Sequence, residues 1–185
     1  MPQDRTQKIV VAGIMAAISV FLGLTRWGFI PWFAGASLTI MQVPVIIGAV
    51  LEGPIVGAVI GLIFGVFSLI QAAIAPNGPT DVIFTNPLIS ILPRLFIGPV
   101  AWLFWSWLKQ WPVVGLVLSG IVGSMTNAVL VLGMIGLLRL APWPLIGSIF
   151  LANSLAEAAL SAILVWAVIS AWWRIPMGKR KGANL

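Results

Sequence analysis

The stretch Ile55–Ala75, which reads IVGAVIGLIFGVFSLIQAAIA, contains no charged residue. A helix needs about 20 consecutive apolar residues to cross the hydrocarbon core of a bilayer. Glu52-Gly53-Pro54 precedes the stretch as a tight turn. Pro54 suits the first turn of a helix, because its missing N–H leaves no hydrogen bond unmade there. The stretch therefore predicts a membrane-spanning helix that begins close to Pro54.

The composition of the whole chain agrees with a membrane environment. Of its 185 residues, 61% are hydrophobic and only 8% are charged, and the mean hydropathy is +1.12. A soluble domain carries roughly 25% charged residues. The chain has too little polar surface to face water, so we expect lipid to be its main solvent.

Five further apolar stretches accompany this helix and predict an all-α integral membrane protein. The six expected spans are residues 9–24, 38–51, 55–75, 87–108, 113–138 and 145–173. No linker is long enough to mark a domain boundary, so residues 1–185 are expected to form a single six-helix bundle. The stretch 38–51 is short and contains Gln42 and Pro44, so we expect it to be tilted, kinked or packed away from lipid.

Lys and Arg residues gather on one side of this topology. With the N-terminus inside, the inner face carries Arg5, Lys8, Lys109, Arg174, Lys179, Arg180 and Lys181, and the outer loops carry only Arg26 and Arg139. Cytoplasmic loops are enriched in Lys and Arg. Both termini are therefore expected in the cytoplasm, with the chain in the plasma membrane. Its net charge of +6 then faces anionic lipid rather than nucleic acid.

The residue types that are missing restrict the chemistry. The chain has no Cys and no His. Disulfides, Cys/His zinc sites and His-based catalysis are thereby excluded, and we expect neither an enzyme nor a cofactor. The sequence contains no phosphate-binding loop and no duplicated half with paired broken helices. A protein of this kind that moves a solute would take its energy from a partner.

Two stripes of small residues could hold helices together. Gly53, Gly57, Gly61 and Gly65 recur every four residues and share one face of the 55–75 helix. Ala12 and Ala16, beside Gly13 and Ala17, form a second stripe on the first helix. Small residues at this spacing let helices approach closely in lipid. Packing within the chain explains both stripes, and the second could instead dock another membrane subunit.

Four polar residues inside the spans are candidates for a binding site, because polar side chains are costly in lipid. With a rise of about 1.5 Å per residue, Arg94 and Asn153 lie ~12 Å, Asn127 ~16 Å and Glu157 ~18 Å below the outer face. Side chains from three helices at similar depth predict a polar pocket that opens outward. The alternative is a structural network, in which Arg94 pairs with Glu157 and the asparagines bridge helices.

A tryptophan-rich loop is expected above this pocket. The segment that follows the first helix contains Trp27, Phe29, Pro31, Trp32 and Phe33. Such an apolar and semi-rigid loop is suited to cover a binding site. It could equally lie in the lipid interface, where Trp is at home.

The order of these features resembles the substrate-binding S component of energy-coupling factor (ECF) vitamin transporters. The similar segments are Ala12-x-x-x-Ala16, TIMQVPVIIGAVLEGPIVGAVIGLIFGVFSLI at Thr39–Ile70, PLISILPRLFIG at Pro87–Gly98, TNAVLVLGMI at Thr126–Ile135 and NSLAEAALSAIL at Asn153–Leu164. The resemblance runs through most of the chain and includes its size and its six expected helices.

The resemblance implies a function and partners. An S component of this family binds a water-soluble vitamin from outside and docks on a transmembrane T component that two cytoplasmic ATPases drive. The family's docking stripe corresponds to Ala12 and Ala16, and its covering loop corresponds to residues 27–37. On this basis Arg94, Asn127, Asn153, Glu157, Trp27 and Trp32 are the expected substrate-binding residues.

The resemblance also suggests a ligand. Riboflavin-type members place an Asp before the proline of the second helix, whereas this chain has Gln42-Val43-Pro44. Arg94 suits a carboxylate ligand, so pantothenate is the first expectation, with folate and cobalamin as alternatives. A structural subunit without a ligand, or a carrier that works alone, are the competing functions.

Overall fold

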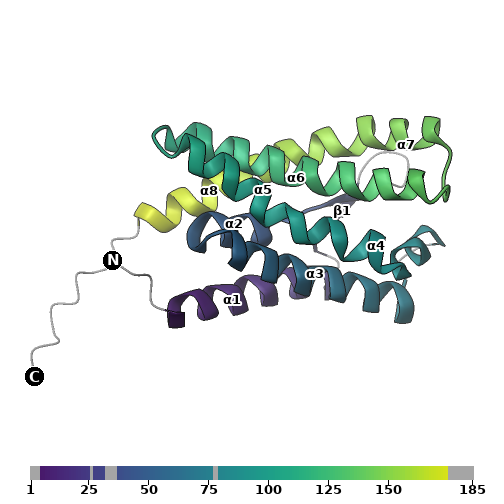
Figure 1. The fold of residues 1–185 in the computed structure, drawn as a ribbon, viewed down its shortest axis with the longest axis horizontal. Helices are drawn as coiled ribbons and strands as arrows, with labels where there is room; N and C mark the ends of the chain where they lie inside the picture. Colours follow the sequence, from purple (N-terminus) through teal and green to yellow (C-terminus); the bar gives the residue numbers. More distant parts are fainter. Residues whose placement is uncertain (1–4, 26, 32–36, 77–78, 175–185) are drawn as a thin grey trace, which may run out of the picture.

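The computed structural model describes residues 5–25, 27–31, 37–76 and 79–174. Helices dominate this part of the chain, and a small two-stranded sheet follows the first of them (Figure 1). In chain order the elements are α1 (Arg5–Leu24), β1 (Phe29–Pro31), β2 (Ser37–Thr39), α2 (Val43–Glu52), α3 (Pro54–Ile74), the 3₁₀ segment η2 (Pro79–Thr85), α4 (Pro87–Ser90), α5 (Leu92–Leu108), α6 (Pro112–Leu137), α7 (Trp143–Ile149), the π-helical segment η3 (Phe150–Ser154) and α8 (Leu155–Arg174).

Five helical stretches in the described residues are long and apolar enough to cross a membrane. They are Arg5–Leu24, Pro54–Ile74, Pro87–Leu108, Pro112–Leu137 and Trp143–Trp173. The expected span at residues 38–51 is the exception. Its helical part, α2, has 10 residues, which cover about 15 Å, or half of the hydrocarbon core. The helical membrane fold is confirmed, and five helices among the described residues are long enough to be candidate spans.

Helix α2 is the centre of the bundle. Nine of its residues are buried, among them Val45, Ile46 and Ala49 with no exposed surface. A helix that is apolar on every side is stable only when other helices surround it, and α1, α3, α5, α6 and α8 all contact α2. The expectation that this stretch packs away from lipid is confirmed.

The segment between α1 and α2 contains a short β-ribbon that the sequence did not predict. Strands β1 and β2 pair antiparallel, with Phe29 opposite Thr39. Two backbone bonds extend the ribbon, from Gly28 N to Leu22 O at 2.9 Å and from Ile40 N to Gly28 O at 3.0 Å.

The ribbon and α2 together return the chain to the end of the bundle where α1 begins. There Gln7 Nε2 of α1 donates to Glu52 Oε1 of α2 at 2.9 Å. Figure 1 shows that α1 (purple) begins and α8 (yellow) ends at this same end, whereas α4 and α7 lie at the opposite end.

The glycine stripe of α3 packs against its own chain. A Cβ at Gly57 would lie 2.9 Å from the Cα of Gly98 on α5, and a Cβ at Gly65 would lie 2.7 Å from the carbonyl oxygen of Ser90 on α4. A Cβ at Gly61 would collide with the carbonyl oxygen of Arg94. Gly53 differs, because it has open space around it and a φ of 103°, so it serves the turn before α3.

Two expected continuous helices contain breaks. The 87–108 helix is divided at Ile91, next to Pro93, into α4 and α5. The 145–173 helix changes to π-helical hydrogen bonding at Phe150–Ser154. π-Helical turns occur often at functional sites, and both breaks lie next to polar residues that the sequence singled out, Arg94 and Asn153.

Candidate functional site

Arg94 lies in the first turn of α5, where the helix break determines its contacts. In an unbroken helix the N–H of residue 93 would bond to the carbonyl oxygen of Ile89, but Pro93 has no N–H. The Nη1 of Arg94 donates to this carbonyl instead. The sequence Ile89-x-x-x-Pro93-Arg94 therefore provides both an unpaired acceptor and the donor that satisfies it.

The guanidinium group of Arg94 is buried between two aromatic rings. Its Cζ atom lies 5.4 Å from the ring centroid of Phe64 and 5.1 Å from that of Phe84. The side chain is 5% exposed, and its Nε has no hydrogen-bond partner. A buried cation is costly unless an anion compensates it, so this arrangement favours a ligand with a negative group.

Glu157 lies in the first turn of α8 and contacts the β-ribbon. Its Oε1 accepts from the backbone N of Thr39 at 2.8 Å and from Thr39 Oγ1 at 3.0 Å. The side chain is 8% exposed. Hydrogen bonds to a charged group are stronger than neutral ones, so Glu157 fastens the end of β2 to α8.

Gln42, directly before α2, is a site residue that sequence reasoning missed. The side chain has no exposed surface. Its Nε2 is 2.9 Å from Thr39 O, 3.4 Å from Ser124 Oγ and 3.5 Å from Ser161 Oγ, while its Oε1 has no partner. The signal in the sequence that could have found Gln42 is a single amide side chain within an apolar stretch, because lipid should exclude such a polar group.

The contacts of Gln42 orient the polar faces of α6 and α8. Ser124 precedes Asn127 by three residues on α6, and Ser161 follows Glu157 by four residues on α8. Residues at these spacings share one face of a helix. Asn127 and Glu157 therefore lie on the faces of α6 and α8 that meet around Gln42. Asn127 is 8% exposed and its Oδ1 is unpartnered.

Asn153 lies in the π-helical segment that leads into α8. It is half-buried, and its Oδ1 has no hydrogen-bond partner. The wider turn of a π-helix changes the direction of side chains relative to an unbroken α-helix. The direction of the Asn153 side chain relative to that of Glu157, four residues later, therefore differs from the direction expected in an unbroken α-helix.

Arg94 and Glu157 interact electrostatically but do not bond directly. The opposite charge of each acts on the other, yet in the described part of the chain Arg94 bonds to Ile89 and Glu157 bonds to Thr39. The alternative network, with a direct Arg94–Glu157 pair, is therefore not the arrangement in this structure. Both charged side chains are buried. The Nε of Arg94, which has no partner, can donate a hydrogen bond to a ligand.

The structure describes one of the two tryptophans of the expected covering loop. Trp27 is 76% exposed and follows the end of α1. Trp32 lies outside the described residues. Their contact with a substrate stays a prediction.

The expected docking stripe is divided between two faces of α1. Ala16 is 5% exposed and belongs to the core, and Ala12 packs partly against that core. Gly13 has open space around it, and Ala17 is exposed. Docking through Ala12 and Ala16 stays a prediction, and the outward small-residue pair of α1 is Gly13 and Ala17.

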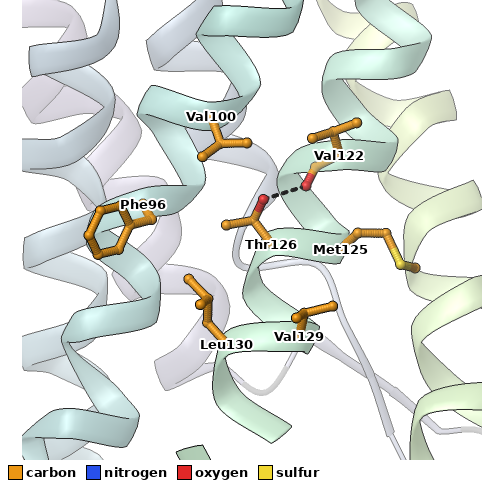
Figure 2. Close-up of a pocket in the computed structure, with 7 residues that line it drawn as sticks. All are labelled: Phe96, Val100, Val122, Met125, Thr126, Val129 and Leu130. Carbon is orange, nitrogen blue, oxygen red and sulfur yellow. Dashed lines mark hydrogen bonds between the residues drawn. The ribbon is translucent and has the colours of Figure 1, made fainter. Parts of the chain in front are cut away.

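The polar residues Gln42, Arg94, Asn127, Asn153 and Glu157 are called the polar cluster below. An apolar groove that none of them lines lies between α5 and α6 (Figure 2). It has a volume of about 490 Å³ and is lined by Phe96, Val100, Val122, Met125, Thr126, Val129 and Leu130. Its one hydroxyl, that of Thr126, donates to Val122 O at 2.7 Å (the dashed line in Figure 2). Apart from this hydroxyl, the side chains that line the groove are apolar.

Comparisons with known proteins identify the family of this chain. Residues 7–169 match the family model described as ECF transporter, substrate-specific component. The pantothenic acid transporter PanT of Lactococcus lactis subsp. cremoris is 28% identical over 191 residues, covering 92% of this chain and 96% of the relative. The pantothenate transporter PanT of Leuconostoc mesenteroides subsp. mesenteroides is 34% identical over 115 residues, covering 60% of this chain and 56% of the relative. The chain belongs to the family of ECF transporter substrate-specific components and is a multi-pass protein of the plasma membrane.

Proposed function

We propose that this protein captures pantothenate from outside the cell as the S component of an ECF-type importer. The observation that carries the ligand assignment is the buried Arg94, whose Nε is unpartnered and whose guanidinium has no direct acidic partner in the described residues. The two relatives named as pantothenate transporters support the same ligand.

The polar groups of the cluster match the chemistry of pantothenate, which has a carboxylate at one end, a central amide and two hydroxyls. Arg94 binds the carboxylate. Asn127 and Asn153, each with an unpartnered Oδ1, accept from the amide N–H and from a hydroxyl. Glu157 accepts from the second hydroxyl or holds β2 in place through Thr39. Trp27 and Trp32 close over the bound ligand.

The proposed topology has six crossings and both termini in the cytoplasm. The second crossing is made by the β-ribbon together with α2, because Glu52 at the end of α2 lies beside Gln7 near the start of α1. The concentration of Lys and Arg at the end where α1 begins supports the cytoplasmic assignment. In this orientation Arg94 and Asn153 belong to the outer half of the membrane.

Transport requires partners in this proposal. The S component delivers its vitamin by docking on a transmembrane T component, which two cytoplasmic ATPases drive. Proteoliposomes that contain this chain alone are expected to bind pantothenate without ATP-dependent uptake, and addition of the T component and ATPases should start uptake. Uptake by this chain alone would support a self-sufficient carrier instead.

Calorimetry on the detergent-purified protein tests the ligand assignment. Panthenol, which has a hydroxymethyl group in place of the carboxylate of pantothenate, is the uncharged control ligand. We expect pantothenate to bind at least about 100-fold more tightly than panthenol, since a buried charge pair is lost in the latter. Arg94→Ala should remove this preference, while Arg139→Ala, outside the cluster, should preserve it.

Two results would overturn the assignment. Equal affinities of the unmodified protein for pantothenate and panthenol would exclude recognition of a carboxylate by Arg94. Binding of folate or cobalamin but not of pantothenate, in a screen of water-soluble vitamins, would keep the family function and replace the ligand.

A further inference from the structure

A second cavity is lined by residues of α1, α2, α3 and α5 near the start of α1. Figure 1 shows that α1 begins at the end of the bundle opposite α4 and α7. The volume of the cavity is about 470 Å³. Two charged side chains and an apolar wall line it, including Lys8, Glu52, Trp102, Val50, Ile55 and Val56. The cavity therefore combines opposite charges with apolar surface at one end of the membrane-spanning helices.

Glu52 has an unused acceptor in the wall of this cavity. The side chain is 5% exposed, its Oε1 accepts from Gln7 Nε2 at 2.9 Å, and its Oε2 has no hydrogen-bond partner. A buried carboxylate oxygen without a donor is costly. This oxygen is suited to accept from a group that enters the cavity.

Lys8 lines the same cavity as Glu52. In the residues that the structure describes, the bonds of Glu52 do not include one to Lys8. Two opposite charges thus line one cavity without pairing directly. A ligand that carries both a cationic donor and an anionic acceptor would satisfy both of them.

We propose that this cavity binds the head group of a zwitterionic phospholipid with a primary ammonium group, such as phosphatidylethanolamine. The ammonium donates to Glu52 Oε2, and the phosphate pairs with the ammonium of Lys8. The acyl chains follow the apolar wall toward Ile9 and Ile55, which are 72% and 78% exposed. Trp102, partly exposed beside the head group, suits a membrane interface.

The charges favour a lipid over a basic side chain from a partner protein. An incoming Arg or Lys would bond to Glu52 but would be repelled by Lys8. A purely anionic lipid would bond to Lys8 but would place its phosphate near the carboxylate of Glu52. A zwitterion complements both residues.

Native mass spectrometry on the detergent-purified chain tests the proposal, with lipids of identical acyl chains titrated in turn. Phosphatidylethanolamine is expected to bind at least about tenfold more tightly than phosphatidylcholine, whose quaternary ammonium cannot donate a hydrogen bond. Glu52→Gln should remove this preference. Lys8→Gln should weaken the binding of both lipids, whereas Lys109→Gln, an exposed cation outside the cavity, should change neither.

Three outcomes would overturn the proposal. Equal binding of the two lipids to the unmodified protein would exclude recognition of the ammonium. Saturation by soluble phosphoethanolamine at the same concentration as the lipid would identify a free zwitterion instead. Lipid preference unchanged in Glu52→Gln, with weakened assembly on the T component, would assign the cavity to a basic side chain of that partner.

Discussion

Glu157 and Thr39, which are 118 positions apart in the sequence, are joined by two hydrogen bonds to one carboxylate oxygen. One donor is the backbone N of Thr39 at 2.8 Å, and the other is its hydroxyl at 3.0 Å. Strand β2 is thereby held against the start of α8. The position of the ribbon is thus linked to the same side chain that is expected to meet the ligand.

Glu157→Gln should loosen this connection. The neutral amide cannot make charge-assisted bonds, so we expect the free energy of unfolding to fall by about 1–3 kcal/mol. Hydrogen exchange at residues 37–42, measured by mass spectrometry, should become faster while exchange in α6 stays slow. Thr39→Val removes only the hydroxyl bond and should produce a smaller change. Unchanged exchange in Glu157→Gln would show that the carboxylate does not fasten the ribbon.

Pro93→Ala should weaken ligand binding without removing a charge. The new N–H at residue 93 can bond to Ile89 O and compete with Arg94 Nη1 for it. Arg94 then loses the bond that orients it, and we expect the pantothenate dissociation constant to rise about tenfold, since bonds to charged groups contribute about 1.5–3 kcal/mol.

Pro99→Ala is the matched control for this change. Pro99 also lies inside α5, but one and a half turns beyond Arg94, so its replacement should leave affinity unchanged. If both variants bind as the unmodified protein does, the helix break has no part in positioning Arg94.

Gly61→Ala should affect both stability and binding. Its Cβ would collide with the carbonyl oxygen of Arg94, and overpacking of this kind costs typically about 1–3 kcal/mol. We expect a lower midpoint of thermal unfolding and weaker pantothenate binding, because α5 must move away from α3. Gly13→Ala, which has open space around it, should leave both values unchanged. A stable Gly61→Ala variant with full affinity would contradict the close packing of α3 and α5.

Gln42→Met should destabilise the fold through unsatisfied polar groups. Its amide lies within bonding distance of Thr39 O, Ser124 Oγ and Ser161 Oγ. Each buried group left without a partner costs about 1–3 kcal/mol, so thermal unfolding should begin at a clearly lower temperature. Gln71→Met removes one bond, from Gln71 Nε2 to Gly23 O at 3.4 Å, and should have a smaller effect. Equal effects of the two substitutions would contradict a central role for Gln42.

The long apolar helices could be predicted from composition, because span length and turn residues report directly on the bilayer. The expected 55–75 helix, for example, is observed as Pro54–Ile74. The expected span at residues 38–51 contains the 10-residue helix α2. Its central position could not be predicted, since hydropathy does not distinguish burial among helices from exposure to lipid. The β-ribbon was not predicted, because its two strands are three residues each and too short to show a period.

For the candidate site, the sequence predicted the polar residues better than it predicted the contacts that they make. Arg94, Asn127 and Glu157 stood out because lipid should exclude them, and all three are buried. Gln42 was missed as a site residue, since it reads as an interruption of an apolar run. The π-helical turn at Phe150–Ser154 contains no proline that would have indicated a break in the helix. The bond from Arg94 to Ile89 depends on a helix break, whereas the sequence predicted a continuous helix over residues 87–108.

Helix α2 carries a polar residue at each end, Gln42 before its first turn and Glu52 as its last residue. Glu52 follows Gln42 by ten positions, which a helical rise converts to about 15 Å. Since a short helix moves as a rigid rod, a displacement along its axis shifts Gln42 in the polar cluster and Glu52 in the second cavity by the same amount. If a ligand at either site displaced α2, the free energy of occupancy of the other site would change, and by linkage the effect would be reciprocal. Helix α2 would then connect the two ends of the bundle mechanically.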